Sequence, residues 1–358
     1  MKKIVFSLLA ALLAMPLLVS CSDFKLDDGD DDIPQGPSSY GAYVLNSGLM
    51  DSNNSALTYF NMLNSAVSTN VFSKANGKGL GDSANDILVY GSKVYIAVTG
   101  SAVVFVTDLS GKIVQEIALS GENSKLAPRQ LVADGGKVYV SYREGYVGAI
   151  DTVSFEVKKA QTGPYPEGLA CAGNKLYVAI TDANNYPSLA NKVQVLDKNS
   201  LQLIKEIEVG YNPQTFHKIS DETMYLVCWG DYAANPAMLQ KINLITDEVT
   251  TIEDVAPTSM AVADEGIIYI LSTGYDENWN PLPGTIYCHD MARNVPLGAF
   301  VTDGTVLPKA YSISAASDGN IYVGCSDYVT TGDVYVLTPE GRLHDKFDSQ
   351  GLNPIRAY

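Results

Sequence analysis

Side chains that stack on flat ligands and side chains that hydrogen-bond to them occur together at intervals along this chain. Aromatic rings bind flat apolar surfaces, whereas amide, carboxylate and guanidinium groups orient a ligand through hydrogen bonds. The predicted ligand-binding residues are Tyr142, Arg143, Tyr146, Asn184, Asn185, Tyr186, Trp229, Asp231, Tyr232, Tyr275, Asp276, Trp279 and Tyr328. Both tryptophans of the chain are in this set. The alternative is that these segments only cap the strands beside them.

Groups that would indicate catalysis are sparse. The three histidines, His217, His289 and His344, are far apart in the sequence, so their spacing predicts no metal triad. The chain also lacks the GxSxG, HExxH and P-loop motifs. We therefore predict a protein that is not an enzyme, with no catalytic residue, no metal and no cofactor. The least favoured alternative is a lactonase or another hydrolase in which carboxylates hold a metal. The candidate carboxylates are Asp182, Asp231, Asp276 and Asp327.

One sequence motif recurs along the chain and predicts the strands that position the candidate ligand-binding residues. A Pro or Asn opens a short, mostly apolar strand, which is followed by a turn and a strand that carries Tyr, 10 to 14 residues after the opening residue. The turns contain the Gly, Asn and Asp residues that hairpins favour. The six copies are Asn85 with Tyr95, Pro128 with Tyr139, Pro166 with Tyr177, Pro213 with Tyr225, Pro257 with Tyr269, and Pro308 with Tyr322.

Each copy continues into two more strands, so the repeat predicts a four-stranded antiparallel meander. Its length of 38 to 51 residues is typical of a β-propeller blade and not of a solenoid coil. One Tyr per blade at the same strand position indicates packing, although buried hydroxyls need hydrogen-bond partners.

The two ends of the chain provide the halves of a seventh copy. Residues 353–358 match the opening phrase, and residues 40–45 match the Tyr strand that should follow it. We predict an all-β, seven-bladed β-propeller over residues 39–358, in which the N- and C-terminal strands share one blade and leave no free edge. A six-bladed ring with an extra hairpin would leave residues 353–358 unexplained.

The connections of such a blade divide between two faces. With the strands named A to D from the axis outward, and the shared blade numbered 1, the B-to-C and D-to-A connections lie on one face. The B-to-C loops are the long and individual ones, and loops on a rigid scaffold often carry binding residues. We predict that the loops of blades 3 to 6 form one patch beside the central channel.

The first 38 residues predict export and lipidation. Lys2 and Lys3 precede an apolar run that ends at Cys21, and this order is typical of a signal peptide over residues 1–20 that is too short to span a bilayer stably. The Leu-Val-Ser-Cys sequence ending at Cys21 resembles the bacterial lipobox, in which the cysteine is lipidated. The acidic segment over residues 21–38 is expected to be a solvated tether. It resembles the surface-export signal of Bacteroidota lipoproteins, and a periplasmic tether is the alternative.

Charge and cysteine usage limit the partners and the chemistry. Removing residues 1–20 changes the formal net charge from −16 to −18, which argues against nucleic acid as a partner. The other cysteines, Cys171, Cys228, Cys288 and Cys325, have no CxxC spacing. We expect them to be buried apolar residues, and a disulfide is the alternative.

The Pro-led strand, the Gly turn, and the Lys-Val-Tyr strand resemble the YncE-like seven-bladed β-propellers over roughly residues 39–358. With Cys21 and the acidic tether, the chain resembles the surface lipoproteins of Bacteroidota of the BtuG type, which bind vitamin B12. That resemblance implies a lipid-anchored, surface-exposed protein of the cell outer membrane, which captures cobalamin or related corrinoids and delivers it to a TonB-dependent outer-membrane transporter. Cobalamin is then a transported ligand and not a cofactor.

The composition of the loops leaves other ligands open. A corrinoid needs broad stacking surface and many hydrogen-bonding partners. A glycan also stacks on aromatic rings and bonds to Asp and Asn. A glycan-binding lipoprotein and a protein-binding adaptor are therefore the alternatives to corrinoid capture.

Overall fold

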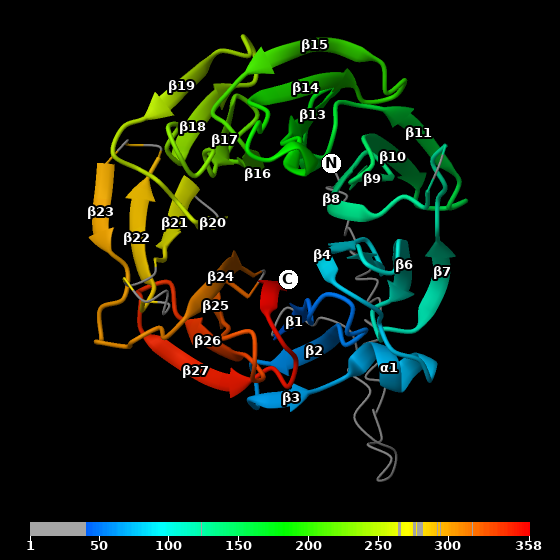
Figure 1. Ribbon diagram of the computed structural model, residues 1–358. Helices are drawn as coiled ribbons and strands as arrows, with labels where there is room; N and C mark the ends of the chain where they lie inside the picture. Colours follow the sequence, from blue (N-terminus) through cyan, green and yellow to red (C-terminus); the bar gives the residue numbers. More distant parts are fainter. Residues whose placement is uncertain are drawn as a thin grey trace, which may run out of the picture. The chain divides into compact units, whose positions relative to one another are not determined.

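A computed structural model describes residues 41–358 apart from 123, 264–265, 275–276, 278–281, 292, 294 and 317. All of the described residues belong to one compact unit, Ile33–Tyr358. Seven four-stranded antiparallel sheets surround a central axis in this unit (Figure 1). The prediction of a seven-bladed β-propeller is confirmed.

The blades follow one another along the chain, and the first-named strand of each is the innermost. Blade 1 contains β28 (Pro354–Ala357), β1 (Gly41–Asn46), β2 (Ala56–Asn61) and β3 (Ala66–Ser68). Blades 2 and 3 contain β4 (Ala84–Tyr90), β5 (Lys93–Val98), β6 (Val103–Asp108) and β7 (Ile113–Ile117), then β8 (Pro128–Asp134), β9 (Lys137–Tyr142), β10 (Tyr146–Asp151) and β11 (Val157–Gln161). Blades 4 and 5 contain β12 (Pro166–Ala172), β13 (Lys175–Ile180), β14 (Lys192–Asp197) and β15 (Leu203–Glu208), then β16 (Pro213–Lys218), β17 (Thr223–Cys228), β18 (Met238–Asn243) and β19 (Val249–Ile252). Blades 6 and 7 contain β20 (Ser259–Val262), β21 (Ile267–Ser272), β22 (Thr285–Asp290) and β23 (Val295–Ala299), then β24 (Ala310–Ala315), β25 (Ile321–Cys325), β26 (Asp333–Leu337) and β27 (Leu343–Asp348).

The two ends of the propeller close blade 1 together, as the sequence predicts. Strand β28 pairs antiparallel with β1, placing Val44 opposite Ala357. Tyr43 and Tyr358 exchange backbone hydrogen bonds, with N···O distances of 3.0 and 2.9 Å. The C-terminus therefore lies inside the ring, next to the first strand (Figure 1).

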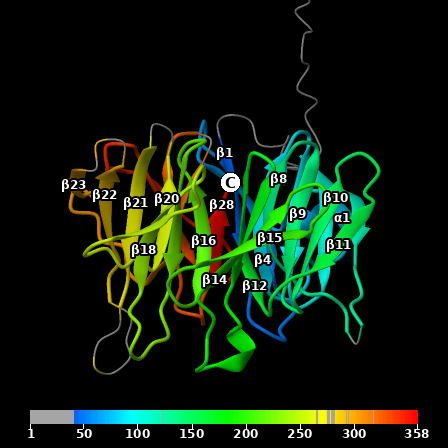
Figure 2. The same ribbon diagram turned by 90° about the horizontal axis from the view of Figure 1, so that it is seen from above.

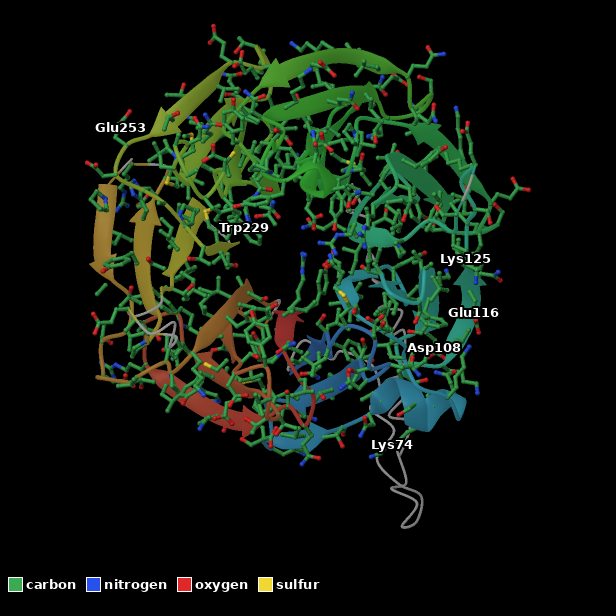
Figure 3. All side chains as sticks on the ribbon, viewed as in Figure 1. Lys74, Asp108, Glu116, Lys125, Trp229 and Glu253 are labelled. Carbon is green, nitrogen blue, oxygen red and sulfur yellow. The ribbon has the colours of Figure 1, made fainter. Side chains whose placement is uncertain are left out.

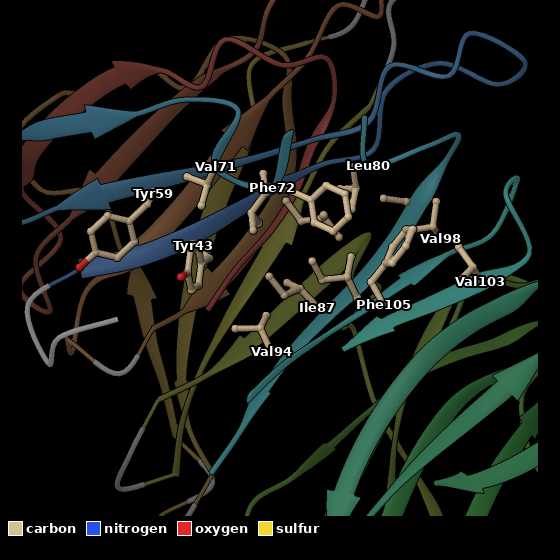
Figure 4. Packing of buried hydrophobic residues seen from close by; sticks show 14 residues of the cluster. Tyr43, Tyr59, Val71, Phe72, Leu80, Ile87, Val94, Val98, Val103 and Phe105 are labelled. Carbon is tan, nitrogen blue, oxygen red and sulfur yellow. The ribbon is translucent and has the colours of Figure 1, made fainter. Parts of the chain in front are cut away.

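The repeated tyrosines pack between blades. Their exposure is at most 5%, and the residues are Tyr43, Tyr95, Tyr139, Tyr177, Tyr225, Tyr269 and Tyr322. Tyr43 is part of an apolar cluster in which side chains of blade 1, blade 2 and helix α1 (Val71–Asn76) interlock (Figure 4). Burial of alternate strand residues against the neighbouring blade removes their apolar surface from water. The prediction that these tyrosines are packing residues is confirmed.

The B-to-C loops differ in length, and that of blade 4 contains the 3-10 helix η1 (Ala183–Asn185). This loop projects beyond the strand ends at the lower edge of the ring in Figure 2.

The four cysteines from Cys171 to Cys325 are free, and burial raises the pKa of Cys228 to about 12. Among the described residues, no helix has both the length and the apolar character required to cross a membrane.

Candidate ligand-binding site

A cavity of about 770 Å³ occupies the end of the central channel on the B-to-C face. Each of the seven innermost strands contributes to its wall, and the B-to-C loops of blades 5, 6 and 7 extend it outward. Its volume is within the range of small-molecule sites. The lining residues are Asn85, Arg129, Gln130, Glu167, Gln214, Thr215, Trp229, Thr258, Ser259, Thr273, Gly274, Leu282, Lys309, Ala310, Tyr311, Ser312, Ser326, Asp327, Tyr328 and Ile355.

Trp229 is the main aromatic surface of this cavity. It follows β17 in blade 5, and its indole Nε1 donates to the carbonyl oxygen of Thr258 at 3.0 Å. The ring is therefore held in one orientation, while 39% of the side chain stays exposed. Figure 3 shows Trp229 at the inner margin of the ring, beside the central opening. A fixed, partly exposed indole is suited to stacking on a ligand.

A second aromatic group lies in blade 7. Tyr311, on β24, and Tyr328, in the B-to-C loop, meet edge to face with ring centroids 5.5 Å apart. Tyr328 is 48% exposed, and its φ of 62° is in the left-handed region. The cavity therefore has aromatic side chains on blades 5 and 7.

The charged side chains of the cavity wall form ion pairs between neighbouring elements. Arg129 of blade 3 donates to both carboxylate oxygens of Glu167 of blade 4, at 2.9 and 2.7 Å. Burial disfavours the charged guanidinium, but the Glu167 carboxylate outweighs that effect and raises the pKa of Arg129. Lys309 Nζ lies 3.2 Å from Asp327 Oδ2. Backbone N–H groups of Thr330 and Val329 lower the pKa of Asp327, so this carboxylate is ionised at neutral pH.

A third ion pair lies beside the cavity, next to Ile355. Arg356 Nη1 donates to Asp86 Oδ1 at 2.7 Å, and Asp86 also accepts the backbone N–H of Leu131 at 2.8 Å. Burial raises the pKa of Asp86, although Arg356 and the backbone N–H groups act in the opposite direction. Burial lowers the pKa of His217 to about 3, with a further contribution from the positive charge of Arg356. His217 is therefore neutral at physiological pH.

Some polar groups of the wall have no hydrogen-bond partner within the described part of the chain. The side chains of Gln130 and Ser259 make no hydrogen bond there. Gln214 is 9% exposed, and its Nε2 donates to the Asn212 side chain at 2.5 Å, which leaves its Oε1 without a partner. These amide and hydroxyl groups are available to a ligand.

The predicted blade 3 residues lie away from the cavity wall. Tyr142 is 1% exposed and packs in the apolar core between blades 2 and 3. Burial raises the pKa of Tyr142, and its hydroxyl has no hydrogen-bond partner among the described residues. Tyr146 is on β10, with Lys159 Nζ 5.3 Å from its ring centroid and the Gln161 amide donating to its hydroxyl at 3.2 Å. Neither ring lines the cavity.

Arg143 and the blade 4 loop form a separate exposed group. The Arg143 guanidinium carbon lies 5.4 Å from the centroid of Tyr165, and its Nη2 is 3.4 Å from Asn184 Oδ1. Asn185 donates to Asp182 at 3.3 Å, and Tyr186 is 64% exposed. None of these side chains lines the cavity.

In blade 5, the predicted loop residues divide between the cavity and the local loop structure. Asp231 accepts backbone N–H bonds from Ala233 and Asn235, at 2.9 and 2.8 Å, and the Asn235 amide at 2.6 Å. These bonds, from Asn235 first, lower the pKa of Asp231. Asp231 therefore shapes its own loop. Tyr232 is 66% exposed and outside the cavity wall, so Trp229 is the predicted residue of this loop that reaches it.

Other predicted residues lie outside the described residues: Tyr275, Asp276, Trp279 and Cys21. Of the predicted ligand-binding residues that are described, Trp229 and Tyr328 line the cavity. The contributing loops are those of blades 5 to 7, whereas the sequence predicts a patch over blades 3 to 6.

Among the carboxylates named for a hydrolase, Asp327 lines the cavity. No group of three His, Cys, Asp or Glu side chains with metal-binding geometry occurs in the portion of the chain that the structure describes.

The contribution of the innermost strands and of the residues just before them was not predicted from the sequence. The missed residues directly follow the proline that opens each repeat, and they are Arg129, Glu167, Gln214, Thr258 and Lys309. A polar residue recurring at one position of otherwise apolar strands was the available signal. It indicates a ring of side chains around the axis, because equivalent positions of all blades have the same distance from it.

Comparisons with known proteins support the fold. Residues 40–306 match the family described as Domain of unknown function (DUF5074). No curated protein matches the sequence. Among solved structures, the chain is similar to one titled Crystal Structure of Mitotic Checkpoint Complex, with 13% identity, TM-score 0.55, and coverage of 92% of this chain and 97% of that one. It is also similar to the Neurospora crassa Pan2 WD40 domain, with 11% identity, TM-score 0.53, and coverage of 73% and 78%. At these identities the similarity shows the propeller fold alone.

Proposed function

This chain belongs to the DUF5074 family, and we propose that it is a binding protein, not an enzyme, whose ligand occupies the central cavity on the B-to-C face. The observation that carries the proposal is the fixed indole of Trp229 on the wall of a 770 Å³ cavity. A β-propeller is consistent with a binding or adaptor role. The rigid ring holds the cavity wall in place, and such preorganisation lowers the entropic cost of binding.

The finer proposal is that the ligand is cobalamin or a related corrinoid. A corrin ring is broad and flat and carries amide groups at its edge, so it requires an aromatic surface and many hydrogen-bonding groups. Trp229, Tyr328 and the amides of Gln130 and Gln214 are groups of these kinds. A corrinoid would extend beyond the cavity onto the B-to-C loops, where Tyr232 and Tyr186 are exposed.

We further propose that the protein is a lipoprotein anchored at Cys21 on the outer-membrane surface, which passes its ligand to a TonB-dependent transporter. The support for this is the sequence of the first 38 residues, with its apolar run, its cysteine and its acidic segment. Metabolic labelling with a radioactive fatty acid tests the anchor. Label in the wild type and none in the Cys21→Ser variant is the expected result, and equal label in both would contradict it.

Gel filtration with cyanocobalamin tests the ligand. The purified protein without residues 1–20 is mixed with cyanocobalamin and separated from free vitamin, and the visible absorbance of the protein peak is measured. We expect the vitamin to elute with the protein. A colourless protein peak at micromolar vitamin would contradict corrinoid capture, and retardation on a polysaccharide affinity gel would then indicate a glycan-binding protein.

A further inference from the structure

We infer that the central cavity selects an uncharged ligand group and excludes both anions and cations. The inference rests on the proposal that this cavity is a binding site, and it adds the chemical class of the group bound there. It does not depend on the ligand being a corrinoid. Two properties of the cavity carry it: its charges are internally paired, and its unpaired groups are neutral.

The described lining contains two cationic and two anionic side chains. Arg129 is paired with Glu167 in a bidentate arrangement, and Lys309 is paired with Asp327. The side chains of Arg129 and Glu167 are 21% and 5% exposed, so this pair is largely shielded from water. The equal number of positive and negative side chains in the cavity lining contrasts with the formal net charge of −16 for the whole chain.

The buried ion pair makes a charged ligand group unfavourable. Glu167 already occupies Nε and Nη2 of Arg129, so a carboxylate would either meet Nη1 beside the negative charge of Glu167 or displace Glu167, which would leave a buried anion without its partner. Removing the partner of a buried charge costs about 3–5 kcal/mol. An ammonium group would face the same competition for Glu167, from a guanidinium that already makes two hydrogen bonds. Neither ion gains a free counter-charge in exchange for its hydration shell.

The groups without partners favour a neutral ligand instead. Among the described residues, Gln130 offers an amide without a partner, Gln214 offers an amide oxygen without a partner, and Ser259 offers a hydroxyl. These side chains can donate to carbonyl oxygens and accept from amide or hydroxyl groups. With the Trp229 ring nearby, the wall fits an apolar ring system that carries amide or hydroxyl groups.

Three naphthalene probes, which carry a neutral, an anionic and a cationic group on the same ring system, test this selection. They are naphthalene-2-carboxamide, naphthalene-2-carboxylate and 2-naphthylmethylammonium, and the readout is the 15N-indole NMR signal of Trp229, assigned with a Trp279→Phe variant. We expect the amide to shift this signal at concentrations about tenfold lower than either ion requires. The variant Glu167→Gln frees Arg129, so the carboxylate should then bind at least about fivefold better than it binds the wild type.

Glu206→Gln is the matched control, because Glu206 pairs with Lys192 at 2.9 Å on the exposed outer part of blade 4. This variant should leave the order of the three probes unchanged. Equal binding of the amide and either ion to the wild type would overturn the inference, and so would the absence of any shift with all three probes. If the amide is preferred but cyanocobalamin does not elute with the protein, the corrinoid proposal fails and the chemical class stands.

Discussion

At the scale of single residues, the repeat tyrosines of blades 1, 3 and 4 connect neighbouring blades through their hydroxyls as well as their rings. Tyr43 of blade 1 donates to the Leu109 carbonyl in the C-to-D turn of blade 2. Tyr139 of blade 3 donates to the carbonyl oxygen of Lys198 in the C-to-D turn of blade 4 at 3.2 Å. Tyr177 of blade 4 donates to the Asp247 carboxylate in the C-to-D turn of blade 5 at 2.5 Å. The same type of contact therefore joins three pairs of neighbouring blades.

The hydrogen bond of Tyr177 should contribute measurably to stability. Asp247 is buried and also pairs with Lys175 and Lys205, so the hydroxyl completes a network around a shielded carboxylate. Replacing Tyr177 by Phe should lower the free energy of unfolding by about 1–3 kcal/mol, since hydrogen bonds to charged groups contribute at that level. Chemical denaturation with urea measures the change.

Tyr95→Phe is the matched control for this prediction. Tyr95 occupies the equivalent position in blade 2 with an exposure of 0%, but its hydroxyl has no hydrogen-bond partner in the described part of the chain. Removing an unsatisfied buried hydroxyl should be neutral or slightly stabilising. A loss of stability in Tyr95→Phe as large as that in Tyr177→Phe would show that the hydroxyl contact between blades is not what stabilises the ring.

At the scale of elements, the innermost strand β28 connects three blades. It pairs with β1 in blade 1, and its Arg356 reaches Asp86 on β4 of blade 2. Asp86 in turn accepts the backbone N–H of Leu131 on β8 of blade 3. The terminal strand therefore closes the ring through backbone pairing and through an ion pair at the axis.

Replacing Arg356 by Met should destabilise the propeller by about 2–3 kcal/mol, because the carboxylate of Asp86 would lose its counter-ion while buried. The Arg356 side chain is 42% exposed, which places the expected loss below that of a fully buried pair. Urea denaturation of the variant measures it. Adding Asp86→Asn should recover part of the loss, since the uncompensated charge is then removed. If Arg356 and Asp86 are not coupled, Asp86→Asn lowers the free energy of unfolding by the same amount in the Arg356→Met variant as in the wild type. That result would contradict the prediction.

At the scale of the whole molecule, the sequence was sufficient to predict the architecture. The spacing from the opening Pro or Asn to Tyr identified the blades, and the match between residues 353–358 and residues 40–45 identified the closure that pairs β28 with β1. Both depend on local patterns that repeat, so each copy supports the others. Repetition made the fold predictable.

The candidate site was less predictable, because a cavity depends on how far each side chain lies from the axis. Loop composition favoured Tyr142 and Asp231, but Tyr142 packs between blades and Asp231 binds its own loop backbone. Tyr142 ends β9, whereas Asp231 and Trp229 lie in the loop after β17. All three are aromatic or polar, and of these Trp229 lines the cavity. Composition cannot distinguish these roles, since burial and hydrogen-bond partners are set by tertiary contacts.

The central claim is that the ligand binds at the cavity wall formed by Trp229 and the innermost strands, and not at the outer loops of blade 3. Titration calorimetry with cyanocobalamin tests it most directly, using the wild type, Trp229→Ala, and Tyr146→Ala as the control. We predict that Trp229→Ala weakens binding by about five- to thirtyfold, since a stacked aromatic ring contributes on the order of 1–2 kcal/mol, and that Tyr146→Ala binds as the wild type does. Unchanged affinity in Trp229→Ala, or a loss confined to Tyr146→Ala, would contradict the claim.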